Sequence, residues 1–133
     1  MRNEDLFKKS AVYEKAYKFA IRIVNAYKYL NAEKKEFILS KQLLRIGTSI
    51  GANIAEANGA ISNSDFSAKM SVAYKECLET RYWLSLLKDT DYIEEKAFES
   101  IYVEADEVSK VLFAILKKTR LTSSSETNPN NPV

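Results

Sequence analysis

Histidine is absent from this 133-residue chain, and glycine, proline and cysteine are scarce, with three, two and one residues. Without histidine the chain lacks the commonest general base, the Ser-His and Cys-His nucleophile pairs, and most transition-metal sites. The single cysteine, Cys77, excludes a disulfide within the chain. No apolar run approaches the roughly 20 residues of a membrane-spanning helix, and residues 1–10 lack the apolar core of a signal peptide. We therefore expect a cytoplasmic protein without membrane association.

The scarcity of helix breakers predicts an all-α fold. Both prolines lie in the last five residues, so over a hundred residues precede the first of them. At this length one domain is expected, residues 1–120, followed by a polar, disordered tail at 121–133. Apolar periodicity and capping residues predict four helices, at about 10–29, 32–58, 63–88 and 93–118. Four helices of similar length joined by short turns predict an antiparallel up-down-up-down four-helix bundle.

Each expected helix carries an apolar seam with steps of three and four residues. Asn31 is the expected N-cap of the second helix, Asn58-Gly59 its stop, and Ser62 the N-cap of the third. The seams of the first, third and fourth helices are Val12, Ala16, Phe19, Ile23, Ala26 and Leu30; Phe66, Met70, Ala73, Cys77, Thr80, Leu84 and Leu87; and Phe98, Ile101, Ala105, Val108, Leu112 and Ile115. Because Cys77 lies on a seam, we expect a buried, unreactive thiol.

The second helix carries two different faces within residues 40–56, SKQLLRIGTSIGANIAE. Leu43, Ile46, Ile50 and Ile54 form an apolar face, and a polar row at steps of three and four residues lies beside it: Gln42, Arg45, Ser49, Asn53 and Glu56. Amides, a hydroxyl and one guanidinium are suited to specific hydrogen bonds rather than to a merely solvated face. Gly47 and Gly51 each cost about 1 kcal/mol against alanine in a helix, which indicates close approach of another backbone.

Two interpretations of the polar row remain open. In the structural one it bonds across helices or subunits, with Arg45 paired to Glu76 or Glu79, because a buried arginine needs a partner. In the functional one the row binds a ligand in a central cavity. The structural interpretation is favoured because bundles use polar seams to fix register. A di-metal centre is not expected, since Glu76-x-x-Glu79 is present but no histidine completes it. We expect no cofactor and no catalytic residues.

Charge is unevenly distributed although the net charge is only +2. Residues 1–50 hold 11 Lys or Arg against five acids, whereas residues 89–107 hold eight acids and one lysine. Such asymmetry fits subunits that meet with opposite signs as well as it fits a basic binding face. Lys15, Lys18 and Arg22 share one helical side and are candidate RNA or DNA contacts, although a solvated face is the plainer interpretation.

The polar row also carries a resemblance. The pattern S-x-Q-L-x-R-x-x-x-S-I-x-x-N-I-A-E at residues 40–56 resembles the signature of the 23S rRNA-intervening-sequence proteins, a family similar to the accessory protein of diversity-generating retroelements. The similarity spans roughly residues 5 to 118, and KECLETRYWL at 75–84 fits one subgroup. Ala57 and Ala60 depart from the family pattern, which has glycine and arginine at these two positions.

The resemblance implies small cytoplasmic bundles that assemble as homopentameric rings, with a relative that binds nucleic acid. We therefore expect a non-enzymatic, homo-oligomeric adaptor or nucleic-acid-binding protein of otherwise unknown function. A purely protein–protein scaffold is the alternative, and an uncharged or acidic ring surface would favour it.

Overall fold

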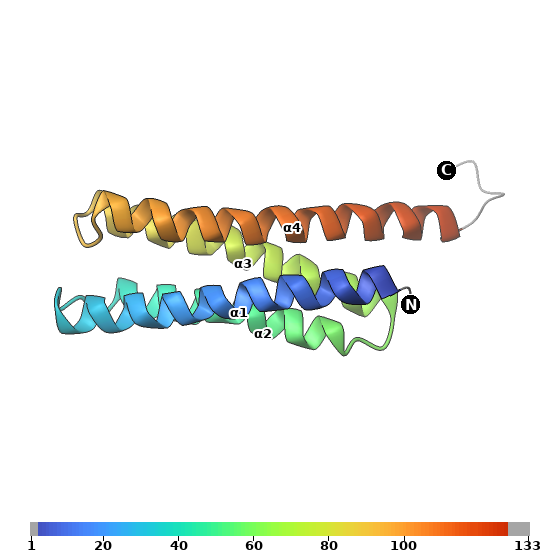
Figure 1. The fold of residues 1–133 in the computed structure, drawn as a ribbon, viewed down its shortest axis with the longest axis horizontal. Helices are drawn as coiled ribbons and strands as arrows, with labels where there is room; N and C mark the ends of the chain where they lie inside the picture. Colours follow the sequence, from blue (N-terminus) through green and yellow to red (C-terminus); the bar gives the residue numbers. More distant parts are fainter. Residues whose placement is uncertain (1–2, 128–133) are drawn as a thin grey trace.

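The computed structural model describes residues 3–127, and side chains within 11–119. Four helices make up this part of the chain, which contains no strand (Figure 1). They are α1 (Asn3–Ala32), α2 (Leu39–Asn58), α3 (Asn63–Asp89) and α4 (Glu95–Thr127). The all-α class is therefore confirmed. None of the four, over the residues described, combines the length and apolar character needed to cross a membrane.

The predicted apolar seams form one shared core. All seven seam residues of α3 are buried, and so are those of α1 apart from the half-buried Ala26. In α4 the last seam position is Leu116 rather than Ile115, because the helix keeps its own period of 3.6 residues instead of a strict heptad. Burial of these side chains supplies the main favourable free energy of folding.

The start of α2 differs from the prediction. Asn31 is not an N-cap: α1 continues through Ala32, and the Asn31 amide donates to the Tyr27 carbonyl oxygen at 2.8 Å. The helix begins at Leu39, where the buried Glu36 carboxylate accepts the backbone N–H of Ser40 at 2.7 Å and that of Ile38 at 3.1 Å. A carboxylate reaching in from the loop therefore takes the capping role expected of Asn31.

Replacing Glu36 by alanine should lower the free energy of unfolding by about 1–3 kcal/mol, because two N–H groups lose a charged acceptor. Glu33→Ala, an exposed acid in the same loop, is the matched control and should change it little. Urea denaturation followed by circular dichroism measures both. Equal stability of the two variants would show that the Glu36 hydrogen bonds do not hold the loop.

The other helix ends agree in part with those predicted from the sequence. α2 stops at Asn58 before Gly59, and Ser62 caps α3 by accepting the Asp65 N–H at 3.0 Å, both as predicted. α1 begins at Asn3 rather than near 10, and α4 continues to Thr127 rather than 118. No proline interrupts the chain before Pro129, so α4 can continue past residue 120, and disorder of the tail stays a prediction. Residues 128–133 lie outside the described residues.

The helices contact one another as four neighbouring pairs. α1 packs on α2, α2 on α3 and α3 on α4, and contacts between α1 and α4 are the sparsest. In Figure 1 the loops at 33–38 and 90–94 lie at one end, and the α2–α3 loop lies at the other. Cross-helix pairs run in opposite order along α2 and α3: Arg45 meets Glu79, Asn53 meets Glu76 and Glu56 meets Lys69. This arrangement places the polar row of α2 against α3.

Candidate functional site

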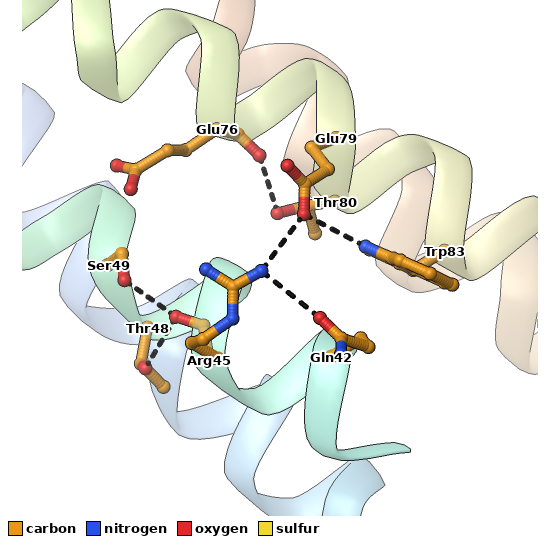
Figure 2. A network of polar contacts seen from close by, with 8 residues as sticks. All are labelled: Gln42, Arg45, Thr48, Ser49, Glu76, Glu79, Thr80 and Trp83. Atoms are coloured by element: carbon orange, nitrogen blue, oxygen red, sulfur yellow. Dashed lines mark hydrogen bonds and ion pairs between the residues drawn. The ribbon is translucent and has the colours of Figure 1, made fainter. Parts of the chain in front are cut away.

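The polar row lies on the seam between α2 and α3. Its α2 members lie beside the buried face of that helix, and two glutamates complete it from α3. The full row is Gln42, Arg45, Ser49, Asn53, Glu56, Glu76 and Glu79. Figure 2 shows one end of this network, where side chains of α2 and α3 point toward each other. Both helices therefore contribute to a single polar site.

Arg45 is the centre of the network. Its Nη2 donates to Gln42 Oε1 at 3.1 Å on its own helix and to Glu79 Oε2 at 3.4 Å on α3 (Figure 2). The same Glu79 oxygen accepts the indole N–H of Trp83 at 3.0 Å. The carboxylate expected to pair with Arg45 is therefore Glu79, and Trp83 holds that carboxylate in place.

A second cross-helix contact joins Asn53 to Glu76. The Asn53 amide donates to Glu76 Oε1 at 2.7 Å and to the Ser49 carbonyl oxygen at 3.2 Å. Partial burial raises the pKa of the Glu76 carboxyl above its ordinary value, and nearby Glu79 adds to the rise. The Asn53 hydrogen bond and the Arg45 charge oppose that rise, so they favour the charged carboxylate.

The remaining members contribute less to the seam. The Ser49 hydroxyl donates back to the Arg45 carbonyl oxygen at 2.6 Å, which satisfies it within α2. Glu56 lies 3.8 Å from Lys69 Nζ in an exposed ion pair, and such pairs contribute at most about 1 kcal/mol. Within the described residues, no buried polar side-chain atom lacks a hydrogen-bond partner.

The row is only half covered within one chain. The Arg45 side chain is 61% exposed and that of Glu79 43%. The premise that the row is buried therefore does not hold for a single subunit, although its cross-helix pairing is as the structural interpretation expects. An exposed network of charged and amide groups can accept further partners without breaking the contacts it already makes.

Metal ligands and the single thiol are the remaining chemical candidates in the described part of the chain. No group of three acidic or cysteine side chains there could hold a metal ion. Cys77 is fully buried, and burial raises the pKa of its thiol to about 12. The burial predicted from the seam is thus confirmed, and the raised pKa favours the protonated, less nucleophilic thiol.

Two of the three basic candidates on α1 pair with acids of α4. Arg22 Nη1 lies 2.9 Å from Glu104 Oε1, and Lys15 Nζ lies 3.9 Å from Glu107 Oε2. Lys18 is exposed and forms no ion pair with any residue described. Two of the three cations are therefore balanced by acids about 80 to 90 residues further along the chain, a pairing that their shared helical side does not reveal.

Comparison with known proteins decides the family. The model of the family described as 23S rRNA-intervening sequence protein matches residues 8–114. The chain belongs to this family. A crystal structure from Bacteroides thetaiotaomicron, described as a protein with unknown function from the S23 ribosomal protein family, is 52% identical to it. That alignment covers 83% of this chain and 98% of the other, with a TM-score of 0.82. No curated protein matches the chain significantly.

Two partners of the polar row were missed in the sequence. Trp83 and Lys69 hold Glu79 and Glu56, and neither was identified as part of the row. The four-residue spacing of Glu79 and Trp83 on one helix face was a usable signal. The pair of Lys69 and Glu56 carries no such signal, since the two residues lie on different helices.

Proposed function

We propose that this family member is a non-enzymatic adaptor that assembles as a homopentameric ring, with the polar row of α2 and α3 at or beside the subunit interface. Each subunit is an antiparallel up-down-up-down bundle, which the opposite order of cross-helix pairs supports. A cytoplasmic location belongs to the same proposal. The observation that carries it is Arg45, which is ordered by Gln42 and Glu79 yet leaves most of its side chain uncovered.

Exposed apolar side chains also favour assembly. Tyr82 is 59% exposed and Phe113 54%, although both lie within helices of the bundle. Scattered exposed apolar residues are ordinary, but aromatic residues and arginine are the types enriched at subunit interfaces. Tyr82 lies on α3 next to Trp83, with ring centroids 5.1 Å apart, close to the Arg45 end of the polar row.

Arg45→Ala tests the role of the polar row. In a monomer this exposed arginine would contribute at most about 1 kcal/mol. If a second subunit covers the row, removing one partner of a buried charge pair costs roughly 2–5 kcal/mol of binding. We therefore expect the variant to dissociate at protein concentrations where the parent chain stays assembled, as measured by light scattering after size exclusion.

The control is Lys110→Ala, which removes an exposed cation paired with Asp106 within one helix at 2.9 Å. Its mass in solution should equal that of the parent chain. An Arg45→Ala protein that kept both its size and its thermal stability while losing only a binding activity would contradict the structural role and favour a ligand site.

Nucleic-acid binding is the second candidate function. Lys18 is exposed without an ion pair among the described residues, and the exposed Tyr17 next to it supplies an aromatic surface for stacking. A ring repeats this pair in every subunit, so weak phosphate contacts add together. Because Lys15 and Arg22 are balanced by α4, Lys18 is expected to be the main phosphate contact among the three.

Titration of RNA and of DNA at several salt concentrations tests this candidate. We expect affinity to fall steeply as salt rises, by about 0.7 to 0.9 in log K per log salt for each phosphate contact. Lys18→Ala should flatten that slope, and Lys96→Ala, on the acid-rich start of α4, should not. A salt-independent response, or no binding at low salt, would leave the protein–protein scaffold as the function.

A further inference from the structure

The loop between α1 and α2 holds two apolar side chains in the solvent. Phe37 is 50% exposed and Ile38 74%. The backbone around them is well fixed: Glu36 N–H donates to the Leu30 carbonyl oxygen at 3.0 Å, and the Glu36 carboxylate accepts from Ile38 and Ser40. Phe37 and Ile38 therefore form a preorganised apolar tip, which a binding partner need not order first.

This loop also carries backbone strain. Lys35 adopts a positive φ of 54°, a region that non-glycine residues occupy at a cost of about 1 kcal/mol or more. The next residue, the buried Glu36, stabilises this turn because its carboxylate accepts the backbone N–H of Ser40. Strained backbone of this kind clusters at functional positions. The strain at Lys35 therefore marks this loop as a candidate binding segment.

A groove of about 440 Å³ lies between α1 and α4, the pair of neighbouring helices with the sparsest contacts. Its apolar wall consists of Ala26, Leu30, Ile93, Ala97 and Ile101. The volume falls within the roughly 300–1,000 Å³ range of binding pockets. One aromatic and one branched side chain are occupants of suitable size and polarity for such a groove.

The charges around the tip and the groove favour binding of one to the other. Lys34, Lys35 and Lys41 surround the apolar tip and are exposed, and none forms an ion pair with the described residues. Two charged residues line the groove: Glu94, which forms no ion pair in the described part of the chain, and Arg22, whose charge Glu104 balances. Glu95 and Glu99 follow on α4 and are likewise without an ion pair among the described residues. A basic tip and an acidic groove attract each other and discourage contacts of tip with tip or groove with groove.

Both features lie at the same end of the bundle, the end that carries the loops at 33–38 and 90–94 (Figure 1). A contact between two different patches at the same height sets each copy beside the next with little shift along the bundle axis. Such head-to-tail contacts produce a closed ring when the rotation between copies closes. One copy can thus supply its tip to one neighbour and its groove to the other.

We propose that the Phe37-Ile38 tip of one copy inserts into the groove between α1 and α4 of a neighbouring copy. This inference rests on the proposed homo-oligomeric assembly and identifies the contact that links its subunits. The occupant of the groove is therefore a second copy of this chain rather than a small apolar ligand or another protein.

Replacing both tip residues, Phe37→Glu with Ile38→Glu, should raise the dissociation constant of the assembly at least about tenfold. Both side chains are largely exposed in one subunit, so its fold should be retained, and circular dichroism checks this. Ile61→Glu is the matched control, because Ile61 is 95% exposed in the loop at the other end of the bundle. An unchanged mass for the tip variant at every concentration would overturn the proposal.

Disulfide formation between two differently substituted chains tests the contact itself. In a Cys77→Ala background, a chain with Ile38→Cys is mixed and reassembled with a chain carrying Ala97→Cys, then oxidised. We expect a cross-linked dimer in the mixture and not from either chain alone. An oligomer of the correct mass without this cross-link would overturn the inference and leave the assembly intact, whereas a monomeric parent chain would overturn both.

Discussion

Ile50→Ala should lower the free energy of unfolding by about 2–5 kcal/mol, the cost of removing a large aliphatic side chain from a close-packed core. Ile50 is fully buried on α2, the helix that packs on both α1 and α3. Truncation leaves a cavity that neither neighbouring helix can fill without losing its own contacts. Urea denaturation at one fixed protein concentration, followed by circular dichroism, measures the loss.

Ile61→Ala is the control for this prediction because it makes the same chemical change at a side chain that is 95% exposed. It should alter the free energy of unfolding by less than about 0.5 kcal/mol. If the two variants were equally stable, Ile50 would not belong to the close-packed core that the structure describes.

Gly47→Leu should cost about 3 kcal/mol, at the upper end of the range for overpacking a core. Even a Cβ at this position would lie 2.8 Å from Cγ1 and 2.9 Å from Cγ2 of Ile23, which is itself fully buried. Because Ile23 is β-branched, its side chain has little freedom to move away. The double variant with Ile23→Ala should recover part of the loss, since the space is then vacant; no recovery would contradict this cause.

Gly51→Ala is expected to raise the free energy of unfolding, whereas Gly47→Leu lowers it. A Cβ there meets the Ala16 backbone at 3.7 Å, an ordinary contact, so alanine fits. Alanine is favoured over glycine in a helix by about 1 kcal/mol. The close approach of another backbone inferred from the sequence therefore explains neither glycine: Gly51 leaves room for a Cβ beside Ala16, and Gly47 is required by the side chain of Ile23.

The apolar periodicity of the sequence predicted the helices and their core because seams with three- and four-residue steps depend only on local helix geometry. The same argument failed at the start of α2. Asn31 has the right side chain for an N-cap, yet the capping groups come from Glu36, whose carboxylate reaches the helix through a strained turn at Lys35. Loop conformations of this kind are set by tertiary contacts that no local pattern records.

The polar row was predictable as a set but not in its pairing. Helical spacing grouped the residues of α2, while the choice of Glu79 for Arg45 and Glu76 for Asn53 depends on how α2 and α3 are aligned. The balance of Arg22 by Glu104 joins residues 82 apart and was likewise beyond the sequence. The exposure of the polar row was misjudged because residue spacing shows only which side of a helix a residue lies on. Whether that side is covered depends on how the helices pack.

The mass of the assembled protein in dilute solution tests the central claim most directly. The claim is that the polar row, open on one side in a single subunit, is matched by a second copy of the chain. Light scattering after size exclusion at low micromolar concentration should give five times the 15.2 kDa of one chain. A mass of one chain at every concentration would contradict the account.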